Sequence, residues 1–343
     1  MTLAHQPGLR NSVLAGVQAG VATAIALPLV LLSPWSHLVG FASLGALVAL
    51  FGRFAPQLDR NRVLFLCAVC QVFAVCSMSA IAWVGAPVFL QLAALALFCG
   101  AFLFVVVNWG FGPPGALIFV FAAAASMGAD LTFVQVMERT VATAAVAGLA
   151  WAICALTEVL RRNDPELFPV AAMLLPIRHL LAMSARATVG AAIAVFASHA
   201  LGAHHPAWAA MGALAVLQGN QLHVNMNRAL QRTVGTLVGA VLAWVLLVQA
   251  PSAAVIIGAL VALQILTELV IGANYALGQV LVTPMALLMT PLAAPHSEGA
   301  AMAPERVLDT LLGAAVGICI AVLLSSVDDR RTLAKTQEKA RKQ

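Results

Sequence analysis

Long, unbroken runs of apolar residues, separated by short polar or proline-containing segments, make up most of this chain. A helix needs about 20 apolar residues to cross the hydrocarbon core of a bilayer. The runs are continuous, unlike the alternating strands of a membrane β-barrel. We therefore predict an all-α polytopic membrane protein with about twelve transmembrane helices. The predicted spans are roughly 13–33, 38–52, 63–83, 87–107, 112–128, 134–160, 179–201, 206–220, 229–249, 252–272, 275–293 and 304–326. The second and eighth are short, so we expect them to be tilted, broken or partly re-entrant.

The two halves of the chain share one sequence register. The tripeptide GAL at 45–47 recurs at 212–214, and the pair ER at 138–139 recurs at 305–306. Both offsets are 167 residues (212 − 45 and 305 − 138). A register that persists over so long a stretch predicts two six-helix repeats. Because each repeat has an even number of helices, the repeats would be parallel, related by an axis along the membrane normal.

The distribution of charge predicts the boundaries and the orientation. We divide the chain into a first membrane repeat (1–160), a cytoplasmic linker (161–178), a second membrane repeat (179–327) and a basic cytoplasmic tail (328–343). With the N-terminus inside, fifteen of the 18 lysine and arginine residues fall on the cytoplasmic side, as the positive-inside rule requires. We expect a multi-pass protein of the bacterial cytoplasmic (inner) membrane with both termini cytoplasmic. The tail either lies on anionic membrane lipid or is solvated.

The composition of the chain excludes several classes of function. The chain of 343 residues is 62% hydrophobic and 9% charged, far from the composition of a soluble enzyme. Its formal net charge of +5 is spread too thinly to predict nucleic-acid binding. The six cysteines lie inside apolar runs, so we read them as small buried thiols. With no catalytic or metal-binding motif in the sequence, we expect no enzymatic activity, no cofactor and no metal site.

Charged residues inside a membrane are costly and are therefore candidate functional residues. Arg139 and Arg306 open the sixth and twelfth predicted helices at their outer ends. They either flank a path for anions or reach to lipid head groups and hold helices together. Asp309 follows Arg306 by three residues, so we expect the two to pair along one helix face. Asp309 is also a candidate for proton coupling.

The seventh, ninth and tenth predicted helices carry further charges. Arg186 lies deep in the seventh, where it either binds an anion or pairs with Glu158 or Glu268. Glu268 either carries a coupling proton or forms an ion pair at the inner surface. Arg228 and Arg232 open the ninth helix, one turn apart on the cytoplasmic side. They could attract an anionic substrate to an inner vestibule, although the positive-inside rule explains them equally well.

Asparagines and glycines mark two further features. Asn108 and Asn274 each precede an aromatic residue and, after two more residues, a glycine. We predict that each lies at a bend and presents its amide to a central inner vestibule, or else caps the fifth helix of its repeat. Glycine pairs four residues apart, at 16/20, 235/239 and 313/317, predict helix faces that pack closely.

Four segments of the second half resemble the fusaric acid resistance / aromatic acid exporter family. They are HPAW at 205–208, NRAL-x-R-x-x-GT-x-x-G at 227–239, NYAL at 274–277 with VTPMAL at 282–287, and R-x-x-DT-x-x-G at 306–313. The first half departs from this pattern, because Ala68 and Val69 replace the glycine–threonine pair and Ala142 replaces the aspartate. The chain looks like a compact form without the central soluble domain of many members.

The resemblance implies efflux of organic anions, in particular aromatic carboxylates, and a periplasmic adaptor of the membrane-fusion type as partner. Related plant malate channels imply a conduit between the two repeats. Three alternatives stay open. One is a major-facilitator-like transporter, although the segment at 55–63 lacks the glycines of that family's signature. The others are an anion channel and a membrane scaffold or assembly protein.

Overall fold

The protein is a bundle of helices. The computed structural model describes residues 9–53, 55, 57–161, 176–219, 222–293 and 302–324, and every regular element within them is helical. The α-helices are α1 (Leu9–Leu31), α2 (Val39–Ala46), α3 (Gln57–Trp83), α4 (Val88–Asn108), α5 (Leu117–Ala125), α6 (Phe133–Leu156), α7 (Ile177–Ala200), α8 (Ala207–Leu217), α9 (Leu222–Leu247), α10 (Ala253–Val270), α11 (Tyr275–Ala293) and α12 (Met302–Leu323). Short 3₁₀ segments are η1 (Ser36–Leu38), η2 (Leu47–Leu50) and η3 (Glu158–Leu160).

Each of the twelve predicted spans overlaps one of these helices, with bounds that differ by up to seven residues. Eight of the described helices are long and apolar enough to cross a membrane, and α2, α5, α8 and α11 are not among them. The second span is broken, as expected, into η1, α2 and η2, and α8 is only 11 residues long. Most of the predicted linker and the whole predicted tail at 328–343 lie outside the described residues.

The short helices α2 and α8 lie inside the bundle. All eight residues of α2 are buried, and so are all residues of α8 after Ala207. Both pack against a long helix near the end of their half, α2 against α6 and α8 against α12. Because protein rather than lipid surrounds them, these helices need not match the thickness of the bilayer.

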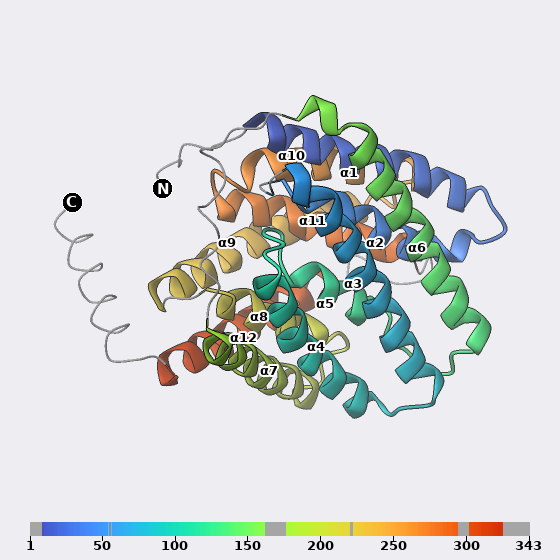
Figure 1. Ribbon diagram of the computed structural model, residues 1–343. Coiled ribbons are helices and arrows are strands. Elements are labelled where there is room, and N and C mark those ends of the chain that lie inside the picture. The colour runs from blue at the N-terminus through green and yellow to red at the C-terminus, as the bar shows by residue number, and fades with distance from the viewer. Residues whose placement is uncertain are drawn as a thin grey trace.

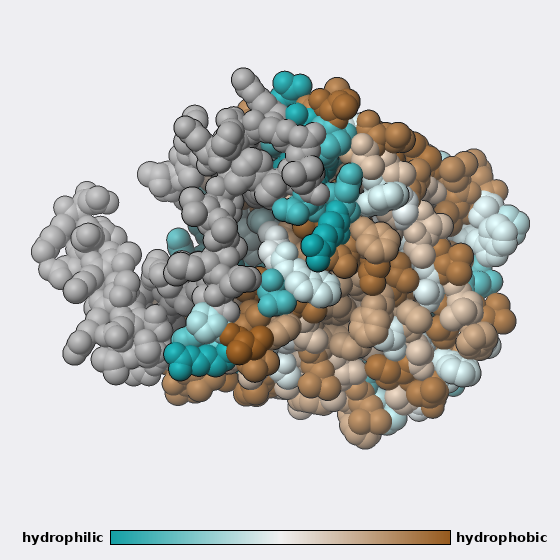
Figure 2. Space-filling model, viewed as in Figure 1, coloured by the Kyte–Doolittle hydropathy of each residue, from teal (hydrophilic) through white to brown (hydrophobic). Residues whose placement is uncertain are grey.

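The two halves of the chain meet along two seams of long helices. One seam joins α1 to α10 and the other joins α4 to α7. In Figure 1, α1 and α10 lie together near the top, while α7 runs beside α12 at the bottom. Helix α1 begins and α12 ends on the left side of this view. Figure 2 shows apolar residues over most of the same face, with hydrophilic residues gathered toward that left side.

Glycines allow the closest helix contacts, as the sequence predicts. A Cβ atom at Gly239 on α9 would lie 2.6 Å from the carbonyl oxygen of Val280 on α11. One at Gly313 on α12 would lie 2.1 Å from that of Ala209 on α8, and one at Gly16 on α1 would lie 3.0 Å from Cα of Ile265 on α10. These positions leave no room for a side chain, so the prediction of closely packed small-residue faces is confirmed.

Candidate functional site

Arg306 on α12 is a buried cation with no acidic partner among the described residues. The residue is 3% exposed, and its guanidinium carbon lies 3.8 Å from the centre of the Trp208 ring on α8. Its Nε and Nη1 atoms are buried and find no hydrogen-bond acceptor among the described residues. An aromatic ring stacks on the face of a guanidinium, whereas the N–H groups point outward in its plane. Those N–H groups therefore stay available to a ligand.

Arg232 on α9 brings a second buried positive charge to the same region. It is 6% exposed, its Nη1 donates to Oε1 of Gln279 on α11 at 3.3 Å, and its helix packs against α12. The sequence predicts Arg232 at the cytoplasmic start of the ninth helix. Helix α9 begins at Leu222, seven residues (229 − 222) before the predicted start. Arg232 therefore lies nearly three turns inside the helix, and the half-buried Arg228 precedes it by one turn.

The predicted pairing of Asp309 with Arg306 is wrong. Oδ1 of Asp309 accepts a hydrogen bond from Oγ of Ser198 on α7 at 2.6 Å. No ion pair joins Asp309 to Arg306, both of which the structure describes. Although Arg306 and Asp309 lie on one face of α12, each contacts a different neighbouring helix. Arg306 turns to Trp208 on α8, and Asp309 turns to α7. The second carboxylate oxygen, Oδ2, is buried without a donor in the described part of the chain.

Arg139 on α6 has a related but more open environment. Its guanidinium carbon lies 4.8 Å from the centre of the Phe41 ring on α2, and its Nη1 donates to the carbonyl oxygen of Ser126 at 3.4 Å. Arg139 is half-buried, whereas Arg306 is almost fully buried. The two aromatic partners are 167 residues apart (208 − 41), the same offset as the arginines (306 − 139).

A histidine–glutamate contact lies beside each of these arginines. His37 contacts Glu138 at 3.3 Å, and His205 contacts Glu305 at 3.0 Å. These side chains are at least partly exposed, so the contacts contribute little to stability. In the described part of the chain, no group of three or more histidine, cysteine, aspartate or glutamate residues could hold a metal ion.

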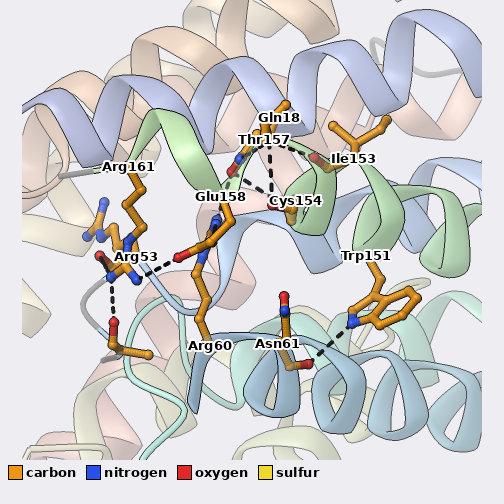
Figure 3. A network of polar contacts seen from close by, with 11 residues as sticks. Gln18, Arg53, Arg60, Asn61, Trp151, Ile153, Cys154, Thr157, Glu158 and Arg161 are labelled. Carbon is orange, nitrogen blue, oxygen red and sulfur yellow. Dashed lines mark hydrogen bonds and ion pairs between the residues drawn. The ribbon is translucent and has the colours of Figure 1, made fainter. Parts of the chain in front are cut away.

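A buried polar network lies at the far end of α6 and is shown in Figure 3. Glu158 accepts from Nη1 of Arg60 on α3 at 2.5 Å and from Nη1 of Arg161 at 3.4 Å. Nη2 of Arg60 also donates to Oε1 of Gln18 on α1 at 2.8 Å. Burial and the neighbouring Arg60 lower the pKa of Arg161, and the Glu158 carboxylate opposes that shift. The positive-inside rule predicts a cytoplasmic location for Arg60 and Arg161 but not their burial.

Arg186 does not pair with either of its two predicted partners. Glu158 is held by Arg60 and Arg161, and Glu268 on α10 pairs with Arg53 at 2.5 Å. Arg186 is half-buried on α7, and its buried Nε has no acceptor among the residues that the structure describes. Of the two alternatives for Glu268, the structure contains the ion pair, although that pair is buried.

The two asparagines differ in their surroundings. Oδ1 of Asn274 accepts from the backbone nitrogens of Ala276 at 2.9 Å and Leu277 at 3.3 Å, so Asn274 caps the start of α11. That is the helix-cap alternative. Asn108 is the last residue of α4 and is exposed.

Sequence reasoning missed the aromatic partners of the arginines and the serine that holds Asp309. A signal for the aromatic residues was present, because Phe41 and Trp208 obey the same 167-residue register as Arg139 and Arg306. No comparable signal marks Ser198, whose contact depends on how α7 packs against α12.

Residues 192–320 match the family model described as fusaric acid resistance protein-like. The resemblance predicted from the sequence is thus confirmed over this segment, which includes Trp208, Arg232, Arg306 and Asp309. The chain is also similar to an uncharacterized membrane protein, YvaC, of Bacillus subtilis (strain 168). The two are 32% identical over 117 residues, which cover 34% of this chain and 18% of that relative. No solved structure matches the chain. With the long apolar helices, these matches identify a multi-pass membrane protein.

Proposed function

We propose that this protein exports organic anions, in particular aromatic carboxylates, across the bacterial cytoplasmic membrane. The observation that carries the proposal is the buried Arg306 guanidinium, whose Nε and Nη1 have no acceptor and no carboxylate partner among the described residues. A buried charge without a partner is strongly unfavourable. A substrate carboxylate would supply that partner, and the planar fork of arginine matches its geometry.

A path for the anion would use the other arginines on either side of this site. Arg228 would attract the anion from the cytoplasm, Arg186 and Arg232 would help to hold it, and Arg139 would act with Arg306 toward the outer side. The membrane potential, negative inside, favours anion exit by about 2.3 kcal/mol per charge per 100 mV. Export of a monoanion can therefore proceed without proton coupling, for which Asp309 and Glu268 are the candidates.

We further propose twelve crossings in two parallel six-helix repeats, with both termini cytoplasmic and the conduit between the repeats. The two seams support this arrangement. In two six-helix repeats, α7 is equivalent to α1 and α10 is equivalent to α4, so the α1–α10 and α4–α7 contacts are equivalent to each other. Gly45 on α2 approaches the carbonyl oxygen of Thr143 on α6, and Gly212 on α8 approaches that of Thr310 on α12, again 167 residues later. The resemblance adds a periplasmic membrane-fusion adaptor as a proposed partner.

Efflux of a labelled aromatic carboxylate from membrane vesicles tests the proposal. The vesicles hold a set potential, with and without a pH gradient. We expect potential-driven efflux from the wild type and a severe loss in Arg306→Gln. The matched control is Arg62→Gln, which removes an exposed arginine of α3. A membrane scaffold would show no efflux at all, and wild-type efflux from Arg306→Gln would exclude this arginine from the path.

A further inference from the structure

One ion pair connects the two halves of the described chain. Nη1 of Arg53, which follows η2, donates to Oε2 of Glu268 on α10 at 2.5 Å, and the side chains of both residues are 5% exposed. Every other ion pair among the described residues lies within residues 9–161 or within residues 176–324. The pair lies at the seam of α1 and α10, where Cβ of Glu268 is also the neighbour of Gly16.

Another residue of the first half, Arg161, binds the backbone at Arg53. Nη2 of Arg161 donates to the carbonyl oxygens of Arg53 at 2.9 Å and Ala55 at 2.5 Å, which holds the backbone at these two residues. Arg161 is itself joined through Glu158 to Arg60. Figure 3 shows how these side chains converge on the segment that carries Arg53.

The network therefore connects α1, α3 and the end of α6 into one unit. Gln18 on α1 accepts from Arg60 and donates through Nε2 to Oγ1 of Thr157 at 2.6 Å. This unit reaches α10 through the Arg53–Glu268 pair. One turn earlier on α10, Oε1 of Gln264 accepts from Oγ1 of Thr23 on α1 at 2.8 Å.

Among the described residues, no ion pair joins α4 to α7 at the other seam. The residue that precedes Glu268 by 167 positions is Ala101 on α4 (268 − 167), which cannot form an ion pair. At that seam Gly100 packs against the Ser184 and Thr188 region of α7. Among the residues that the structure describes, the ion pair between the halves therefore lies at the seam of α1 and α10.

We propose that Arg53 and Glu268 form an ionic lock that closes the cytoplasmic side of the seam between α1 and α10. While the pair is intact, α10 is fixed to the network of the first half, and the seam is closed to water from the cytoplasm. Separation of the pair lets α10 move away from α1. The lock rests on the proposed function in one respect, since it regulates access to a path between the two halves.

Cysteine accessibility tests the lock without any substrate. Thr267→Cys, in a background free of the native cysteines, places a thiol beside Glu268 at a position that is 4% exposed. Inside-out vesicles are treated with a membrane-impermeant maleimide. We expect Glu268→Gln to raise the labelling rate about tenfold, and the exchanged pair Arg53→Glu with Glu268→Arg to bring the rate back toward that of the parent. Asp59→Asn, which removes an exposed carboxylate of α3, should leave it unchanged.

A second variant guards against misfolding, because Glu268→Gln leaves Arg53 buried without its carboxylate. The neutral pair Arg53→Met with Glu268→Leu removes both charges of the lock, and it should also label about tenfold faster. Parent-level labelling in both Glu268→Gln and the neutral pair, or equally fast labelling of Asp59→Asn, would overturn the lock. Since no anion is present, failure of the export proposal shows only in the efflux assay.

Discussion

Replacement of Arg306 by lysine separates the two properties that this side chain combines, its positive charge and its planar fork. Lysine keeps the charge but cannot offer two parallel N–H donors or stack flat on Trp208. A hydrogen bond to a charged group contributes about 1.5–3 kcal/mol. We therefore expect Arg306→Lys to raise the anion concentration for half-maximal efflux roughly 10- to 100-fold. Arg62→Lys is the control, and an unchanged concentration dependence in Arg306→Lys would show that charge alone matters.

Ser198 holds Asp309 in a position where it does not pair with Arg306. Loss of the hydroxyl in Ser198→Ala frees the carboxylate to turn to Arg306 and compete with the substrate. We expect weaker anion binding in Ser198→Ala, measured by the same efflux assay. Because Asp309→Asn removes the competing charge, the double variant Ser198→Ala with Asp309→Asn should recover the affinity. A double variant as weak as Ser198→Ala would contradict this account.

Sequence reasoning identified Arg306, Asp309 and Glu268 as charges within the membrane but not their partners. It missed the burial of Arg53 and Arg60. Spacing along one helix predicted a pair between Arg306 and Asp309, yet Trp208 and Ser198 on other helices compete for these side chains. Likewise, Arg186 pairs with neither predicted acid, because Glu158 and Glu268 are held by arginines of the first half. Contacts between helices depend on the packing of the whole bundle, which spacing within one helix does not contain.

At the scale of the helices, substitution of two glycines measures the effect of packing on stability apart from the effect of helix propensity. Gly239 on α9 faces α11 with no space for a Cβ atom, whereas a Cβ at Gly258 on α10 would meet nothing within 4 Å. Overpacking costs about 1–3 kcal/mol, so we expect Gly239→Leu to lower the Tm of the purified protein in detergent. Gly258→Leu adds the same side chain on an exposed face and should change stability by only about 0.5 kcal/mol. Equal losses of stability in both variants would mean that the contact between α9 and α11 is not tightly packed.

Every α-helix in the described part of the chain overlaps a predicted apolar run, because lipid or protein interior surrounds almost all of each run. Ends were harder to predict, and α9 shows why. Its first turns contain Asn225, Asn227 and Arg228, so hydropathy places the start of the span at 229. A backbone can continue as a helix through polar residues, because its hydrogen bonds do not depend on side-chain polarity. Hydropathy therefore predicts where a side chain is apolar rather than where a helix begins.

For the whole molecule, the sequence contains more than the pattern of apolar runs. The offset of 167 residues relates the arginine–aromatic contacts of α6 and α12, and it also relates the glycine contacts of α2 and α8. Such a shared register is expected where equivalent positions of the two halves make equivalent contacts. It cannot predict the one-sided features, the buried Arg53–Glu268 pair and the Ser198–Asp309 bond, since neither has a counterpart in the other half.

Parallel and inverted repeats differ in which side of the membrane equivalent positions face. Ser36 and His204 precede α2 and α8, while Asn61 and Asn227 lie near the starts of α3 and α9, and all four are exposed. In a cysteine-free background, we expect cysteines at 36 and 204 to react with an impermeant maleimide added outside intact cells. Cysteines at 61 and 227 should react only after the membrane is opened, because arginines concentrate on that side. Inverted repeats would instead place 36 and 204 on opposite sides, and the conduit between two parallel halves would have to be abandoned.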